Sequence, residues 1–140
     1  MSQRFEELLD IFESDDNLWV GIVTGNGKVF CAGADLKSIS KGESIFTKRG
    51  GFAGLVQRDR KKPLIAAVNG AALAGGCEIV LACDLVVAVE SAVFGVPEVK
   101  RALVAAAGGL FRLPRRLPPA IAMEMILTGG ILSSLAIVCC

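Results

Sequence analysis

Histidine is absent from this 140-residue chain, and its absence removes every catalytic triad and every metal site that needs an imidazole. An excess of one charge is also missing, because fifteen basic residues face fourteen acidic ones and leave a net charge of +1. This balance gives no general attraction to nucleic acid or to an anionic membrane, so neither partner is expected. Hydrophobic residues make up 53% and charged residues 21%, which argues against disorder and favours one domain with a buried core.

Paired cysteine motifs and long apolar runs are missing as well. No CxxC pair occurs, and an odd number of cysteines favours reduced thiols in an intracellular compartment, cytoplasmic or mitochondrial. The cysteines are Cys31, Cys77, Cys83, Cys139 and Cys140. No uncharged run reaches the roughly 18 apolar residues that a membrane-spanning helix needs. Residues 1–7 also lack the layout of a signal peptide.

The helical segments follow from residue spacing. Phe5, Leu8, Leu9 and Phe12 recur at helical spacing with acidic residues between them, which predicts an amphipathic helix. A further helix is expected to begin at Asp35.

Later helices are expected in three segments. The first is a short buried helix over residues 75–83, entered through glycine. Residues 97–113 form a helix that Pro114 breaks, and residues 120–127 form another.

Continuous apolar runs predict the strands. Residues 64–68 and 85–89 read as strands covered on both faces, and residues 18–24 read as a mostly buried strand. Alternation of such strands with helices indicates the α/β class. Residues 42–54 are glycine-broken and are expected to form a lid or a pocket wall.

Residues 58–62 form the one concentrated basic patch. A solvated face ahead of a buried strand explains it, and an anchor for a phosphate-bearing ligand is the other interpretation. RNA binding would rest on this patch alone. Such binding should weaken steeply with salt.

The segment around Gly75, Gly76 and Glu78 is the strongest candidate for chemistry. The glycines could serve tight packing or let a ligand oxygen approach backbone N–H groups at a helix N-terminus. Glu78 could simply favour the helix dipole. Its neighbours are apolar, however, so burial should raise its pKa toward neutrality. Glu98 follows Pro97, and taken alone it fits the start of a surface helix.

Several segments, in order and spacing, resemble one family. They are residues 27–37 (GKVFCAGADLK), 62–70 (KPLIAAVNG), 74–78 (AGGCE), 82–84 (ACD), 94–98 (FGVPE), 107–109 (AGG) and 122–124 (AME). Together they resemble the crotonase superfamily, also called the enoyl-CoA hydratase/isomerase family. The resemblance implies an α/β fold, a crotonase-like spiral of ββα units that is incomplete here.

The resemblance also implies roles for individual residues. The backbone N–H groups of Ala34 and Gly75 match the family's oxyanion hole. Glu78 and Glu98 match the two acids with which hydratases add water to a trans-2-enoyl-CoA. Substrate-binding positions are implied at Ala32, Asp35, Leu36, Lys37, Gly76 and Gly109. Ala74 replaces a glycine frequent in the family, a change expected to be mild.

Partners and alternatives follow from the same resemblance. Coenzyme A enters as part of the acyl-CoA substrate, no separate cofactor or metal is expected, and the family implies a homotrimer or hexamer. The chain is expected to be a single domain truncated at both ends, most similar over residues 18–128 and atypical over 131–140. Isomerisation or other enolate chemistry on an acyl-CoA is one alternative. An inactive truncated subunit that binds acyl-CoA or a full-length relative is another.

Overall fold

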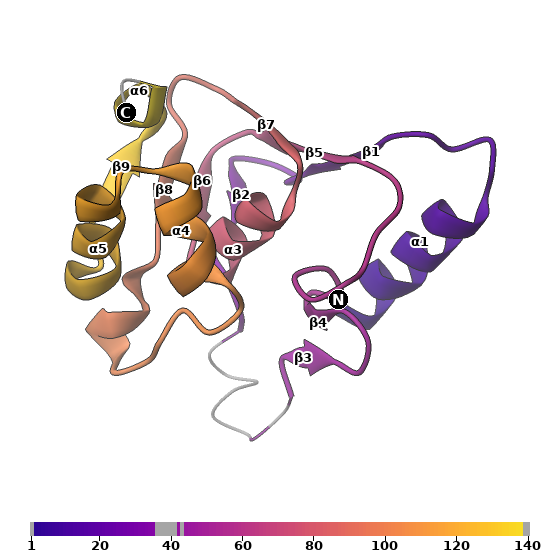
Figure 1. Ribbon diagram of the computed structural model, residues 1–140, viewed down its shortest axis with the longest axis horizontal. Coiled ribbons are helices and arrows are strands. Elements are labelled where there is room, and N and C mark those ends of the chain that lie inside the picture. The colour runs from indigo at the N-terminus through magenta and orange to yellow at the C-terminus, as the bar shows by residue number, and fades with distance from the viewer. Residues whose placement is uncertain (1, 36–41, 43, 139–140) are drawn as a thin grey trace.

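The computed structural model describes residues 2–35, 42 and 44–138 of the chain (Figure 1). Its described strands build two main sheets. The first sheet has three parallel strands in the order β1 (Gly21–Thr24), β5 (Leu64–Val68) and β7 (Leu85–Ala88). Two of these strands sit where continuous apolar runs predict them, at residues 64–68 and 85–89.

The second sheet runs beside the first and consists of shorter strands. Its order is β2 (Val29–Cys31), β6 (Ala71–Leu73), β8 (Val93–Gly95) and β9 (Ile131–Ser133). The first three are parallel, and β9 returns antiparallel to β8. Each turn of the chain therefore gives one strand to each sheet: β1 with β2, β5 with β6, and β7 with β8. This is a spiral of strand pairs, as the resemblance to the crotonase superfamily implies.

Helices and a small hairpin complete the described elements. They are α1 (Ser2–Ser14), the hairpin β3 (Phe46–Thr47) and β4 (Gly51–Phe52), α3 (Gly75–Ala82), the 3-10 helix η1 (Pro97–Arg101), α4 (Gly109–Arg116), α5 (Pro119–Thr128) and α6 (Ser134–Val138). Figure 1 places α1 and the hairpin on one side of the sheets and α4, α5 and α6 on the other. The predicted helices at residues 5–12, 75–83 and 120–127 are confirmed.

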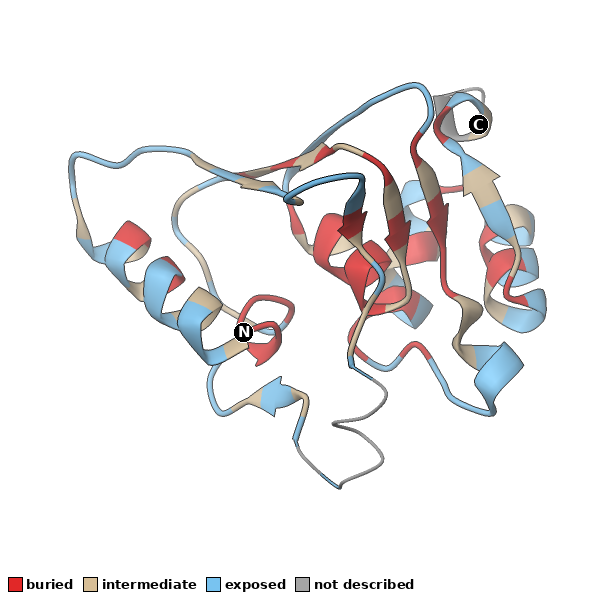
Figure 2. Ribbon diagram, turned by 180° about the vertical axis from the view of Figure 1, so that it is seen from behind, coloured by how far each residue is buried: buried red, intermediate tan, exposed pale blue. Residues whose placement is uncertain are grey.

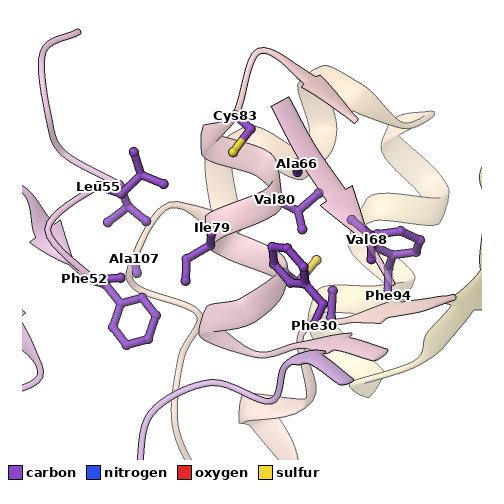
Figure 3. Packing of buried hydrophobic residues seen from close by; sticks show 14 of the residues in the cluster. Phe30, Phe52, Leu55, Ala66, Val68, Ile79, Val80, Cys83, Phe94 and Ala107 are labelled. Carbon is purple, nitrogen blue, oxygen red and sulfur yellow. The ribbon is translucent and has the colours of Figure 1, made fainter. Parts of the chain in front are cut away.

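The core is built around α3. Figure 2 shows burial concentrated there, and Figure 3 shows Ile79 and Val80 of α3, with Cys83 directly after the helix, among side chains of the surrounding strands and loops. Cys77 and Cys83 are buried free thiols, and Cys31 is a half-buried one. Burial raises the pKa of the Cys77 thiol to about 12. No disulfide joins these three thiols within the described part of the chain, and Cys139 and Cys140 lie outside it.

The expectation of a strand covered on both faces is wrong for β7, and the expectation of a mostly buried strand at residues 18–24 is wrong for β1. Val87 is 64% exposed and Ile22 is 68% exposed, and every residue of β7 is exposed. The strand predicted at residues 18–24 begins only at Gly21, and Trp19 before it is 77% exposed. A continuous apolar run is typical of a strand that is buried on both faces. Within the described residues, however, no element covers the exposed side chains of β1 and β7.

The single helix predicted over residues 97–113 is also wrong. Two backbone positions explain why: Ala102, with φ 55°, ends η1, and Gly108, with φ 118°, precedes α4. Pro114 does not break the helix but lies inside α4.

The basic patch at residues 58–62 is not a solvated face. Arg58 pairs with Asp10, Arg60 Nη1 lies 2.9 Å from Asp84 Oδ2, and the side chains of both arginines are nearly buried. Lys62 Nζ donates to the carbonyl oxygens of Phe12 (2.8 Å) and Asp15 (2.6 Å). Three of the patch's cations thus fasten α1 and the chain before β7 to the rest of the fold, which removes the basis for a phosphate anchor there.

Candidate active site

Glu78 is a buried acid on the first turn of α3. It is 3% exposed, and the backbone N–H of Gly109 donates to its Oε1 at 2.9 Å. Burial raises the pKa of Glu78 to about 7; the Gly109 N–H opposes the rise, and the Glu98 charge adds to it. The upward pKa shift expected from the apolar neighbours is confirmed.

Glu98 lies at the start of η1 and faces the same region. Its Oε2 is buried and has no hydrogen-bond partner among the described residues. Burial raises the pKa of Glu98 as well. The charges of Glu78 and Glu98 both raise the pKa of the Cys77 thiol, which places the two carboxyl groups within electrostatic reach of one another. The structure therefore brings together the two acids that the sequence separates by twenty positions.

Two backbone N–H groups are free at the start of α3. Gly75 is the first residue of the helix, where an amide has no partner inside the helix, and no hydrogen bond from it is found among the described residues. The same holds for the N–H of Ala34 within the described part of the chain. A Cβ on Gly33 would lie 3.2 Å from Gly75 N, so the backbone that carries Ala34 crosses next to the helix start.

The glycines of the site are held by close contacts. A Cβ on Gly75 would lie 2.4 Å from the Phe52 ring, and one on Gly76 would lie 2.0 Å from the Cys31 carbonyl oxygen. A Cβ on Gly109 would lie 3.0 Å from the Ala105 Cβ and 3.2 Å from Glu78 Oε1. Tight packing thus accounts for Gly76. Gly75 is tightly packed as well but also carries the backbone N–H described above, and Gly109 donates its N–H to Glu78.

A cleft of about 1180 Å³ opens beside this site. Ala34 and Asp35 line it, and so do Phe46 and Phe52 of the hairpin. The expectation of a pocket wall in residues 42–54 is confirmed for the described part of that segment. Glu78 and Glu98 are not among the cleft's lining residues, and the Phe52 ring forms the boundary between the cleft and Gly75.

Some predicted binding residues stay untested. Ala32 is exposed beside the cleft's wall, and Asp35 is exposed at its edge. Leu36 and Lys37, together with most of the helix expected from Asp35, lie outside the described residues. No cluster of three or more histidine, cysteine or acidic side chains suited to a metal occurs in the part of the chain that the structure describes.

Phe52 and Arg112 contribute to the site, and the sequence patterns did not single them out. The ring of Phe52 covers Gly75, and Arg112 interacts electrostatically with Glu78. One signal was present for Arg112, because it is the only charged residue between Ala102 and Leu113. Nothing local in the sequence marks Phe52.

Ala74 holds a strained backbone conformation directly before Gly75. Its φ is 52° and its ψ is −128°, a backbone conformation that residues with a Cβ rarely adopt. The Ala74 N–H donates to the Gly95 carbonyl oxygen at 2.9 Å, so pairing with β8 holds the residue there. The replacement of the family's glycine is therefore not mild for the backbone.

The substitution Ala74→Gly is expected to raise the free energy of unfolding by about 1 kcal/mol, because it relieves this strain. Urea unfolding followed by circular dichroism measures the change. The matched control is Ala82→Gly at the end of α3, where the same substitution should instead lower the free energy of unfolding by up to about 1 kcal/mol. A loss of stability in both variants would contradict the strain.

Known proteins match most of this chain. The sequence profile of the family described as enoyl-CoA hydratase/isomerase matches residues 1–135. A carnitinyl-CoA dehydratase of Proteus mirabilis is 46% identical over 132 residues, which cover 91% of this chain and 51% of that protein. A carnitinyl-CoA dehydratase of Salmonella enteritidis is 49% identical over 127 residues, covering 88% of this chain and 49% of that protein.

Solved structures show the same relationship. The crystal structure of an enoyl-CoA hydratase from Mycobacterium marinum superposes with a TM-score of 0.93 at 51% identity, covering 99% of this chain and 54% of that one. A carnitinyl-CoA dehydratase from Mycobacterium avium gives a TM-score of 0.93 at 49% identity, covering 96% and 54%. The chain thus has the crotonase fold and spans about half the length of the relatives it matches.

None of the described helices is long and apolar enough to cross a membrane. The fold and the order of the motifs agree with the profile match over residues 1–135. This chain belongs to the enoyl-CoA hydratase/isomerase family.

Proposed function

We propose that this site adds water across the double bond of a trans-2-enoyl-CoA thioester, with coenzyme A present only as part of the substrate. One observation carries the proposal: the buried Glu78 and the half-buried Glu98, both with raised pKa values, lie in the same part of the fold as two backbone N–H groups that have no partner among the described residues. Two carboxyl groups in one apolar site favour a state with one proton shared between them near neutral pH. Such a state supplies one base and one acid.

Each group then has a role in the reaction. The Glu78 carboxylate takes a proton from a water molecule as the water oxygen bonds to the β-carbon. The electrons of the double bond move toward the thioester oxygen, which the N–H groups of Ala34 and Gly75 stabilise as an enolate. The Glu98 carboxylic acid gives its proton to the α-carbon and is left ionised, and exchange with solvent restores the starting protonation.

The names of the relatives support this chemistry. Carnitinyl-CoA dehydratase describes the removal of water from an acyl-CoA, which is hydration in reverse. Those relatives are about twice the length of this chain, so their names alone do not assign hydratase activity to it. The expected homotrimer or hexamer stays a prediction, and the molar mass in solution would check it.

The direct test is the loss of the conjugated enoyl absorbance when the purified chain is mixed with crotonyl-CoA. Steady loss of that absorbance, with formation of the 3-hydroxyacyl product, is the expected result. A folded chain that leaves crotonyl-CoA unchanged at micromolar protein concentration would contradict the proposal.

A second measurement distinguishes the role of Glu78 from that of Glu98. With butyryl-CoA in D₂O no water is added, and the site can only exchange the hydrogen on the α-carbon through the enolate. Glu98→Gln is expected to slow this exchange by about 10²–10⁴-fold, whereas Glu78→Gln should affect it much less. Glu124→Gln, on the exposed side of α5, is the matched control and should behave as the unaltered chain. Unchanged exchange in Glu98→Gln would remove Glu98 from this role.

A further inference from the structure

Arg112 is the half-buried arginine of α4, whereas Arg115 and Arg116 on the same helix are exposed. Its guanidinium donates Nη2 to the Val56 carbonyl oxygen at 2.5 Å and Nη1 to the Ala107 carbonyl oxygen at 3.2 Å. The two acceptors belong to segments far apart in the sequence. A planar guanidinium with several fixed donors is suited to joining them.

One of these two segments forms a hydrogen bond with Glu78. The loop at residues 107–109 ends with the Gly109 N–H that donates to Glu78 Oε1. The guanidinium lies directly against this loop, because a Cβ on Gly108 would be 1.9 Å from Arg112 Nη1. Gly108 also has a φ of 118° and accepts the Arg112 backbone N–H at its carbonyl oxygen, at 3.0 Å. Any residue except proline would donate that backbone bond, so the contact of the guanidinium with the loop is the part that requires arginine at position 112.

The other segment covers Gly75. The Val56 N–H donates to the Phe52 carbonyl oxygen at 3.3 Å, so the carbonyl that Arg112 reaches belongs to the same turn as Phe52. The Phe52 ring packs on Gly75. Arg112 thus connects the loop that holds the buried acid to the turn that covers a free backbone amide.

We propose that Arg112 is a positioning residue: its guanidinium ties the loop at residues 107–109 to the Val56 carbonyl, and so keeps the Gly109 N–H on Glu78 and the Phe52 ring on Gly75. Its importance for hydration rests on the function proposed above. The geometric role does not, because the bonds exist without substrate.

The charges around Glu78 agree with this role. Glu98 faces Glu78 from η1, Cys77 adjoins it on α3, and Arg112 faces it from α4. The Arg112 cation acts against the rise in the pKa of Glu78. Burial lowers the pKa of Arg112 itself; Glu78 opposes that shift, and the charges of Arg115 and Arg60 add to it.

The test uses nuclear magnetic resonance on the isotopically labelled chain without substrate. Arg112→Gln removes the charge and the two-armed bridge, and Arg112→Lys keeps the charge but removes the bridge. Arg115→Gln is the matched control, because Arg115 is on the same helix, lies over the same Phe111 ring and is exposed. The two readouts are hydrogen exchange of the Gly109 amide and the titration midpoint of the Glu78 carboxyl carbon.

Gly109 amide exchange is expected to rise by about tenfold in both Arg112 variants, the effect of losing one supporting hydrogen bond, and to stay unchanged in Arg115→Gln. The Glu78 titration is expected to move upward from about 7 in Arg112→Gln, and less in Arg112→Lys. Unchanged exchange in both Arg112 variants, or an equal change in Arg115→Gln, would overturn the proposal. If Arg112→Gln fails to fold by circular dichroism, exchange in Arg112→Lys decides. These readouts need no turnover, so they remain decisive even if crotonyl-CoA is not hydrated.

Discussion

Replacing Glu78 with glutamine is expected to slow hydration of crotonyl-CoA by about 10²–10⁴-fold, the usual contribution of one positioned acid–base group. Glutamine has the same shape and can still accept the Gly109 N–H, so the substitution removes the base without opening a cavity. What is lost is the oxygen that takes the proton from water. The measurement is the rate of loss of enoyl absorbance at saturating substrate.

Two controls make this result specific. Glu124→Gln changes the same residue type at an exposed position and should keep full activity. α-Hydrogen exchange on butyryl-CoA should survive in Glu78→Gln, because the enolate forms without an attacking water. Full hydration activity in Glu78→Gln would remove Glu78 from its proposed role, and loss of both reactions would point instead to a damaged oxyanion site.

The chain is expected to lose about 3 kcal/mol of stability as the pH rises from 5 to 8, an unusual direction for a protein rich in paired carboxylates. The cause is the pKa of Glu78, raised from the ordinary 4.5 to about 7 by burial. A carboxyl with a raised folded-state pKa binds its proton more tightly in the folded chain than in the unfolded one. This contribution is therefore fully present below about pH 4.5 and is lost as the pH passes through about 7. Glu98, with its pKa raised by burial, acts in the same direction.

Urea unfolding at pH 5 and pH 8, followed by circular dichroism, measures this loss. The carboxyl groups with lowered pKa values, among them Asp10 and Asp84, ionise below this window, so they contribute equally at both pH values. Glu78→Gln should remove most of the difference, and Glu124→Gln should leave it intact. Equal stability of the unaltered chain at both pH values would show that burial does not raise the pKa of Glu78.

The chemistry of the site was more predictable from the sequence than its supporting structure. The raised pKa of Glu78 follows from a local fact, one acid in an apolar run that must be buried for the helix to pack. The free amide of Gly75 follows from its place at a helix start. In contrast, the contact of Phe52 with Gly75 and the two bonds of Arg112 join segments that only the folded chain brings together.

The fold, too, was predictable from the sequence only in part. The helix α3 and the strand β5 were evident because each buries a long apolar segment. The strands β6, β8 and β9 have three residues each, too few for any periodicity to develop. The spiral repeat left no fixed period in the sequence, because the first turn carries the hairpin of β3 and β4 and the second does not.

The position of Trp19 has a practical consequence for spectroscopy. It is the single tryptophan of the chain, and it already faces water in the folded state, next to the bare side chains of β1. Its emission should therefore change little when the protein unfolds, which makes intrinsic fluorescence a poor monitor of denaturation. The emission of Trp19 would shift to shorter wavelength if another polypeptide covered that sheet. Trp19 fluorescence can therefore be used to detect such a contact.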